Sequence, residues 1–93
     1  MDRYWTAVYN TFDLLPLDAK RDFLYSFVDV ARQEIDWDHL REAIRPWSHG
    51  EQVLVRLAHC LYNEGEHVGI DDLQVLSPET RRAVLTIIDR CYG

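Results

Sequence analysis

Histidines are the side chains of this chain best suited to acid–base or metal chemistry near neutral pH. There are four, His39, His49, His59 and His67. No two stand four residues apart, the spacing that places two metal-binding histidines on one helical face. Each is therefore predicted to be a surface or helix-capping residue. The sequence predicts no metal site on these grounds.

Serine nucleophiles have no activating context either. Ser48 and Ser77 stand where helix N-caps are expected, so both have a structural explanation. The chain has no GxSxG elbow, no glycine-rich phosphate loop and no paired metal carboxylates. We therefore expect no catalytic residues, no enzyme activity and no cofactor.

The stretch 63–74 has the outline of a calcium-binding loop between two helices. Aligning Ile70 as its central apolar residue puts Val68 where the loop requires glycine, and Gln74 where it requires glutamate. Calcium binding is therefore not expected. Val68 and Ile70 are predicted to hold this loop against the core or to pair with another extended edge.

The two cysteines, Cys60 and Cys91, both fall on apolar helix faces and form no CxxC pair. They are predicted to be reduced core thiols. A disulfide between them remains an alternative, provided that their helices pack side by side.

Carboxylates provide the main candidate binding surface. If residues 18–33 form one helix, its inner face carries the apolar residues Phe23, Leu24, Phe27, Val28, Val30 and Ala31. Asp18, Asp22 and Asp29 then lie within about 40° of one another on its outer face. A short helix after Asp36 adds further negative charge nearby. The candidate partner-binding residues are Asp18, Asp22, Tyr25, Asp29, Asp36, Asp38 and Glu42. The alternative interpretation is an ordinary solvated face.

The overall charge and hydropathy limit the kinds of partner. The formal net charge of the 93 residues is −6, which argues against direct binding to nucleic acid. No run approaches the roughly 18 apolar residues of a membrane span, and the N-terminus lacks the basic and apolar regions of a signal peptide. We therefore expect a soluble cytoplasmic protein that does not bind membranes.

Helices must position all of these side chains. Ser48 and Glu51 have the spacing of a capping box. The helix that follows, about Glu51–Tyr62, is apolar around most of its circumference, with Gln52, Arg56 and His59 left on a narrow polar strip. It is predicted to be the central helix, wrapped by the others.

The remaining apolar periodicity predicts an all-α fold, a compact single domain (1–93) of four main helices and two short ones. The other expected helices cover about 1–15, 18–33, 37–45, 71–76 and 78–91. The last helix should bury Leu85 among its apolar residues and expose Arg82.

The absence of chemistry together with many aromatic residues indicates a non-catalytic protein-interaction module. It would bind a protein partner through an acidic and aromatic helical face, and self-association into a homodimer is its simplest form. The alternative is a small acidic inhibitor that mimics nucleic acid and occupies a nuclease or another defence enzyme.

Overall fold

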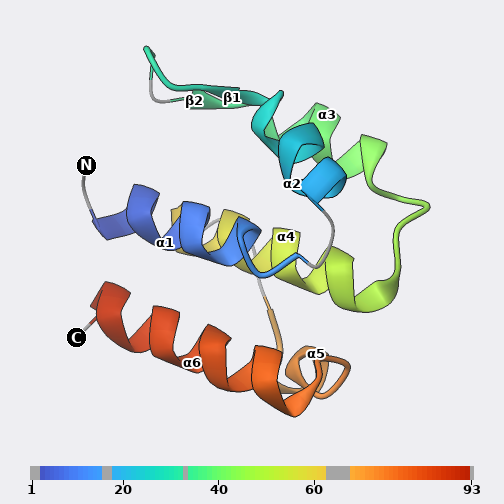
Figure 1. Cartoon of the computed structure of the whole chain (residues 1–93), viewed down its shortest axis with the longest axis vertical. Helices are drawn as coiled ribbons and strands as arrows, with labels where there is room; N and C mark the ends of the chain where they lie inside the picture. Colours follow the sequence, from blue (N-terminus) through green and yellow to red (C-terminus); the bar gives the residue numbers. More distant parts are fainter. Residues whose placement is uncertain (1–2, 16–17, 33, 63–67, 93) are drawn as a thin grey trace.

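Within the residues that the structure describes, six helices and one short hairpin form the fold (Figure 1). The computed structural model describes residues 3–15, 18–32, 34–62 and 68–92. The elements in chain order are α1 (Arg3–Phe12), α2 (Asp18–Tyr25), β1 (Val28–Asp29), β2 (Glu34–Ile35), α3 (Trp37–Ala43), α4 (His49–Tyr62), α5 (Ile70–Leu73) and α6 (Pro78–Tyr92). The predicted all-α class is confirmed. The predictions on His67 and on the first part of the stretch 63–74 concern residues outside the described ranges.

Helices α1 and α4 form the centre of the molecule. Helix α1 packs along α4 on one side and against α6 on another. In the view of Figure 1, α2, α3 and the hairpin lie at the top of the molecule and α6 lies at the bottom. The apolar positions of α4 are buried as predicted: Val53, Leu54, Val55, Leu57, Ala58 and Leu61. Helix α1 shares this central place, which its sequence pattern did not predict, and its Val8 and Phe12 are almost fully buried.

Side-chain caps start the helices where the sequence predicts them. The Ser48 amide donates to Glu51 Oε1 at 3.1 Å, and the Glu51 amide donates to Ser48 Oγ at 3.3 Å, which completes the capping box. Asp36 accepts from the His39 amide at the start of α3, and Ser77 accepts from the Thr80 amide at the start of α6. The helix starts predicted at Asp36, Ser48 and Ser77 are confirmed, whereas the short helix expected over 71–76 is α5, which begins after Gly69 and ends at Leu73.

The predicted helix over 18–33 is wrong in its second half. Helix α2 ends at Tyr25, and the chain then forms an antiparallel hairpin in which Val28 pairs with Ile35 and Asp29 with Glu34. Only Leu24 is buried in α2. Val30, expected on an inner helical face, is 68% exposed.

Local hydrogen bonds explain why the helix stops. The Ser26 hydroxyl donates to the Phe23 carbonyl at 2.6 Å, a local bond that competes with continued helix. The Phe27 amide donates to Leu24 and its carbonyl accepts from Asp36, so the backbone here already joins the hairpin. The β-branched Val28 and Ile35 favour the extended form, and Ile35 reaches the core.

Two predictions about the C-terminal third are also wrong. Ile70 does not hold the loop to the core: it opens α5 and is 82% exposed, whereas Val68 does pack against the core. Leu85 lies on the outside of α6 and is 50% exposed. Arg82 is exposed as predicted.

The prediction that His59 lies on an exposed strip of α4 is wrong. Its ring stacks on the buried Trp37, with ring centroids 4.3 Å apart and planes 5° from parallel. Gln52 and Arg56 are half-buried as well. His59 and Gln52 are thus covered by α3 and the turn after it, while Arg56 lies near Asp72 of α5. No helix within the described ranges is long and apolar enough to cross a membrane.

Candidate functional site

The predicted acidic residues are interleaved with basic ones. Four of them pair with a basic side chain three residues later in the sequence. The pairs are Asp18–Arg21, Asp29–Arg32 (3.8 Å), Asp36–His39 (2.6 Å) and Glu42–Arg45 (3.0 Å). Three of the six predicted carboxylates, Asp18, Asp29 and Glu42, therefore lie beside an arginine, and these parts of the surface carry both charges.

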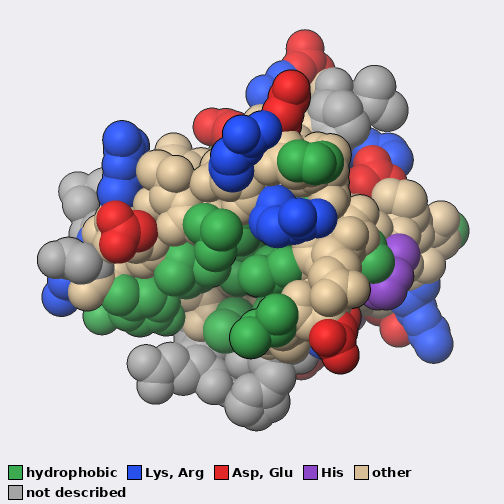
Figure 2. Space-filling view, turned by 90° about the horizontal axis from the view of Figure 1, so that it is seen from below, with side chains coloured by type: hydrophobic (Ala, Val, Ile, Leu, Met, Phe, Trp, Pro, Cys, Tyr) green, Lys and Arg blue, Asp and Glu red, His purple; other side chains and the backbone are tan. Residues whose placement is uncertain are grey.

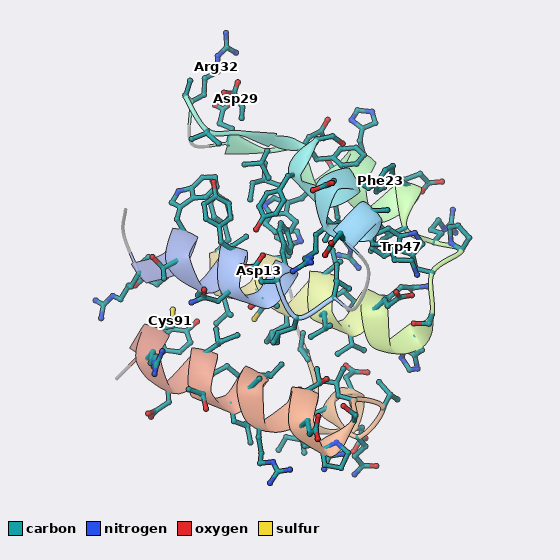
Figure 3. The ribbon with its side chains drawn as sticks, viewed as in Figure 1. Asp13, Phe23, Asp29, Arg32, Trp47 and Cys91 are labelled. Carbon is teal, nitrogen blue, oxygen red and sulfur yellow. The ribbon has the colours of Figure 1, made fainter. Side chains whose placement is uncertain are left out.

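The row of three aspartates predicted on one helical face is wrong. Asp18 and Asp22 belong to α2, but Asp29 lies in β1, and Figure 3 shows it near Arg32 at the far end of the hairpin. Asp29 Oδ1 accepts from the Arg32 amide at 3.1 Å. Asp29 therefore stabilises the hairpin turn and is separated from the other two carboxylates.

Tyr25 ties α2 to the end of α1. Its hydroxyl donates to Asp13 Oδ1 at 3.1 Å, and its ring packs 5.5 Å from Tyr9 and 5.8 Å from Phe12, centroid to centroid. Burial, reinforced by the Asp13 carboxylate, raises the pKa of Tyr25 to about 12. Of the predicted binding residues, Tyr25 is the one with the most extensive packing inside the molecule.

An aromatic cluster lies where α2 meets the α3–α4 junction. The Phe23 ring is 5.3 Å from the Phe27 ring and 5.8 Å from the Trp47 ring, and Figure 3 shows Phe23 and Trp47 on the same side of the molecule. Phe23 is 40% exposed, although the other two are half-buried. We call Phe23, Phe27 and Trp47 the Phe23 surface.

Lys20 supports the Phe23 surface from beneath, through contacts with Trp47 and Glu51. Lys20 Nζ lies 5.2 Å from the centre of the Trp47 ring and 2.5 Å from Glu51 Oε2. Burial alone would raise the pKa of Glu51, but hydrogen bonds from Lys20 and Ser48 outweigh it and hold that pKa below its ordinary value. The pair joins α2 to the first turn of α4, so the aromatic rings rest on a defined framework.

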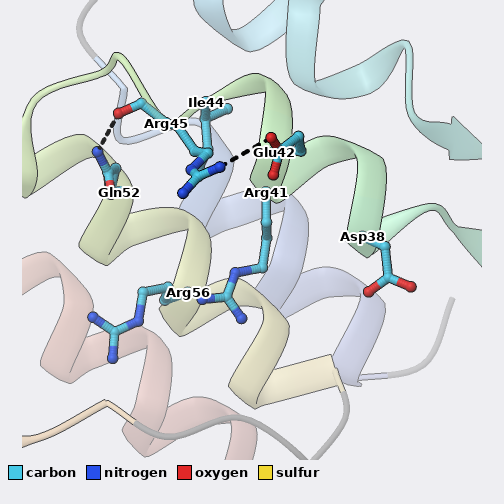
Figure 4. Close-up of a pocket in the computed structure, with 7 residues that line it drawn as sticks. All are labelled: Asp38, Arg41, Glu42, Ile44, Arg45, Gln52 and Arg56. Atoms are coloured by element: carbon cyan, nitrogen blue, oxygen red, sulfur yellow. Dashed lines mark hydrogen bonds and ion pairs between the residues drawn. The ribbon is translucent and has the colours of Figure 1, made fainter.

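A polar cleft of about 430 Å³ opens between α3 and α4 (Figure 4). Its lining residues are Asp38, Arg41, Glu42, Ile44, Arg45, Gln52 and Arg56. We call it the arginine cleft. The side-chain amide of Gln52 donates to the Arg45 and Trp47 carbonyls at 2.9 and 2.8 Å, which fixes the turn between α3 and α4.

A second cavity of about 320 Å³ lies between α1 and α6. Arg3, Asn10, Arg90 and Cys91 are among its lining residues. Figure 3 shows Cys91 near the end of α6. Cys91 is buried and Cys60 half-buried, and the two are not disulfide-bonded, as predicted.

The outer side of α6 carries exposed hydrophobic residues. Leu85 is 50% exposed and Tyr92 is 54% exposed. Figure 2, which views the molecule from the side of α6, shows hydrophobic side chains gathered across this face between charged ones. This surface is the second apolar area that a partner could contact.

The part of the chain that the structure describes contains no candidate metal site. There, no group of three or more histidine, cysteine, aspartate or glutamate side chains is placed to hold a metal ion. His39 pairs with Asp36, His49 begins α4 and His59 stacks on Trp37.

Sequence reasoning missed both the Phe23 surface and the arginine cleft. It assigned Phe23 and Phe27 to a buried helical face, because it extended their helix to residue 33. Arg41 and Arg45 stand four residues apart, a signal visible in the sequence, but Arg56 joins them only through the packing of α3 on α4. Comparisons with known protein families, curated proteins and solved structures find no match to this chain.

Proposed function

We propose that this chain is a non-catalytic, cytoplasmic protein-interaction module that binds a partner protein through the Phe23 surface. The observation that carries the proposal is a cluster of three aromatic rings in which Phe23 packs against the other two and stays 40% exposed. Aromatic side chains held rigidly at a surface are typical of binding hot spots, since little conformational entropy is lost when they are covered.

The neighbouring charge defines the kind of partner. Asp22 is exposed and directly precedes Phe23, while Asp18 is paired with Arg21. A partner that presents an apolar side chain to Phe23 and a basic one to Asp22 would complement both. In this complex the aromatic rings would make the principal contact with the partner, and Asp22 would make a secondary one.

The acidic-inhibitor alternative receives less support from the geometry. A mimic of nucleic acid needs carboxylates spaced like phosphates without cations among them. Here Asp18, Asp29 and Glu42 each lie beside an arginine. We therefore rank this function second, and a nuclease remains one class of partner to be examined.

Self-association is the version that can be tested first, because it needs no second protein. Sedimentation equilibrium would be measured for the wild type, Phe23→Ser and the matched α6 variant Leu85→Ser. A dimer lost only in Phe23→Ser supports self-association through the Phe23 surface. A dimer lost only in Leu85→Ser contradicts it and assigns the interface to α6.

A different partner protein is tested by binding measured with purified components. A protein retained by the wild-type chain and not by Phe23→Ser would be purified and titrated by calorimetry. We expect Phe23→Ser to raise the Kd at least tenfold and Asp22→Lys to raise it several-fold, with Leu85→Ser unchanged. Equal affinity for wild type and Phe23→Ser, or equal recovery of every retained protein by the two, would refute the proposed surface.

A further inference from the structure

Part of the apolar side of α6 stays exposed. The residues of α6 that the core buries are Val84, Ile87 and Cys91. At about 100° per residue, Leu85, Ile88 and Tyr92 lie directly beside them on the helix circumference. Leu85 and Tyr92 are exposed and Ile88 is half-buried. We call Leu85, Ile88 and Tyr92 the α6 stripe; Figure 2 views the molecule from this side.

The spacing of the α6 stripe is that of a helix–helix contact. Ile88 follows Leu85 by three residues, and Tyr92 follows Ile88 by four. Apolar residues that alternate in steps of three and four form the seam along which two helices of a coiled coil pack. An exposed seam of this kind fits a second helix that lies along α6.

Two opposite charges border the α6 stripe on its outer edge. Arg82 and Asp89 are both exposed and lie within about 20° of each other around α6, about 40–60° from Leu85. They are seven residues apart, which separates them by about 10 Å along the helix axis. Within the described ranges neither side chain takes part in an ion pair. Both are therefore available to a charged group on another molecule.

We propose that a second copy of this chain packs antiparallel to α6 on the α6 stripe. Two antiparallel helices bring the same edge of each into contact, so Arg82 of each copy lies opposite Asp89 of the other. A parallel pair would instead put the two Arg82 side chains at the same level. The charges thus complement a second copy in one orientation, and a symmetric interface contains two such pairs.

The apolar residues fit the same register. The point midway between Arg82 and Asp89 falls between Leu85 and Thr86, so Leu85 of each copy lies near the centre of the contact. There it can pack against Leu85 and Ile88 of the other copy. The centre of the interface is then apolar and its edge is charged, as is usual for contacts between proteins.

Helix α6 is held in place before any second copy binds. Arg81 Nε donates to the Leu73 carbonyl and Arg81 Nη2 to the Leu76 carbonyl, both at 3.1 Å, which ties the turn after α5 to the first turn of α6. The Ser77 cap fixes the start of the helix. An ordered helix loses less entropy on binding than a mobile one.

This inference goes beyond the proposed function. The α6 stripe and the Phe23 surface have no residue in common. With two copies paired through α6, the Phe23 surface of each copy is left for a different protein.

Sedimentation equilibrium of charge-reversal variants tests the inference. We expect the wild type to form a dimer. Arg82→Asp and Asp89→Arg should each raise the dimer Kd about tenfold, because each change places like charges opposite one another twice. An equimolar mixture of the two variants should dimerise about as well as the wild type, because the mixed pair again places opposite charges together. Restoration in the mixture also shows that both variants are folded.

Arg90→Asp is the matched control, since it gives the chain the same net charge as Arg82→Asp but lies on the side of α6 that lines the cavity next to α1. It should leave the dimer Kd within twofold of wild type, and so should Phe23→Ser. Leu85→Ser should raise the dimer Kd at least tenfold.

Three results would overturn the inference. These are a wild type that stays monomeric, a mixture that dimerises no better than either variant alone, and a dimer lost in Phe23→Ser but kept in Leu85→Ser. Failure of the proposed function is a separate result, because it appears as an unchanged Kd of Phe23→Ser for the partner protein in calorimetry.

Discussion

At the scale of single residues, an acidic side chain followed three positions later by a basic one recurs over much of the described surface. The pairs begin at Asp18, Asp29, Asp36 and Glu42. Side chains three residues apart meet on a helix surface almost as well as those four apart. A search of the sequence for partners at both spacings would have found these pairs, and would have given the acidic surface less weight.

The part-buried Lys20–Glu51 pair should matter more than any of these. Glu51→Gln keeps a residue able to complete the capping box but removes the charge facing Lys20. We expect the free energy of unfolding in urea at neutral pH to fall by about 1–2 kcal/mol. Glu42→Gln, which affects an exposed pair, should change it by less than about 0.5 kcal/mol.

The loss of stability caused by Glu51→Gln should be larger at neutral pH than in acid. The folded-state pKa of Glu51 lies below its ordinary value near 4.5, so the stabilisation is fully present above that value. It is lost as the pH falls through the lower, folded-state pKa. The difference between wild type and Glu51→Gln should therefore shrink in acid, and a difference that grows there would contradict the assignment.

At the scale of elements, the hairpin is where local pattern and final structure differ most. Residues 28–31 have the apolar spacing of a helix, yet Val28 is β-branched and pairs with Ile35 in the strand. The hairpin holds to the core through Ile35, which is 9% exposed. Strand β1 is stabilised mainly by its pairing with β2, which carries Ile35, and by the hydrogen bond from the Arg32 amide to Asp29.

Two substitutions in this segment should separate the hairpin from a helix. Ile35→Ala should lower the free energy of unfolding by about 2–4 kcal/mol, because it leaves a cavity beside the core. Val30→Ala, at a position 68% exposed, should change it by less than about 0.5 kcal/mol. Urea unfolding of both variants measures this, and a larger loss at Val30 would instead indicate the inner helical face predicted from sequence.

At the scale of the whole molecule, aromatic rings join elements that are distant in sequence. Phe12 of α1 lies 5.8 Å from Tyr25 of α2 and 6.3 Å from Trp37 of α3, centroid to centroid. Trp37 in turn covers His59 of α4. One nearly fully buried ring thus connects three helices, whereas Phe23 contacts two half-buried rings, Phe27 and Trp47.

Phe12 and Phe23 should therefore respond very differently to the same substitution. Phe12→Ala should lower the free energy of unfolding by about 3–5 kcal/mol, a large share of the 5–15 kcal/mol typical of small domains. Phe23→Ala should cost about 1 kcal/mol or less, because its ring is 40% exposed. Thermal unfolding followed by circular dichroism compares them, and equal losses would show that Phe23 is a core residue and not a binding one.

The sequence by itself determined the helical class, the helix starts at Asp36, Ser48 and Ser77, and the buried face of α4. These depend on spacing within one turn or one helix, which local pattern specifies. Only the tertiary structure decided that Phe23 stays at the surface, that His59 lies under Trp37 and that Arg56 lines one cleft with Arg41 of α3 and Arg45 of the turn after it. Such features depend on which helices pack together, and periodicity along one segment carries no information about its neighbour.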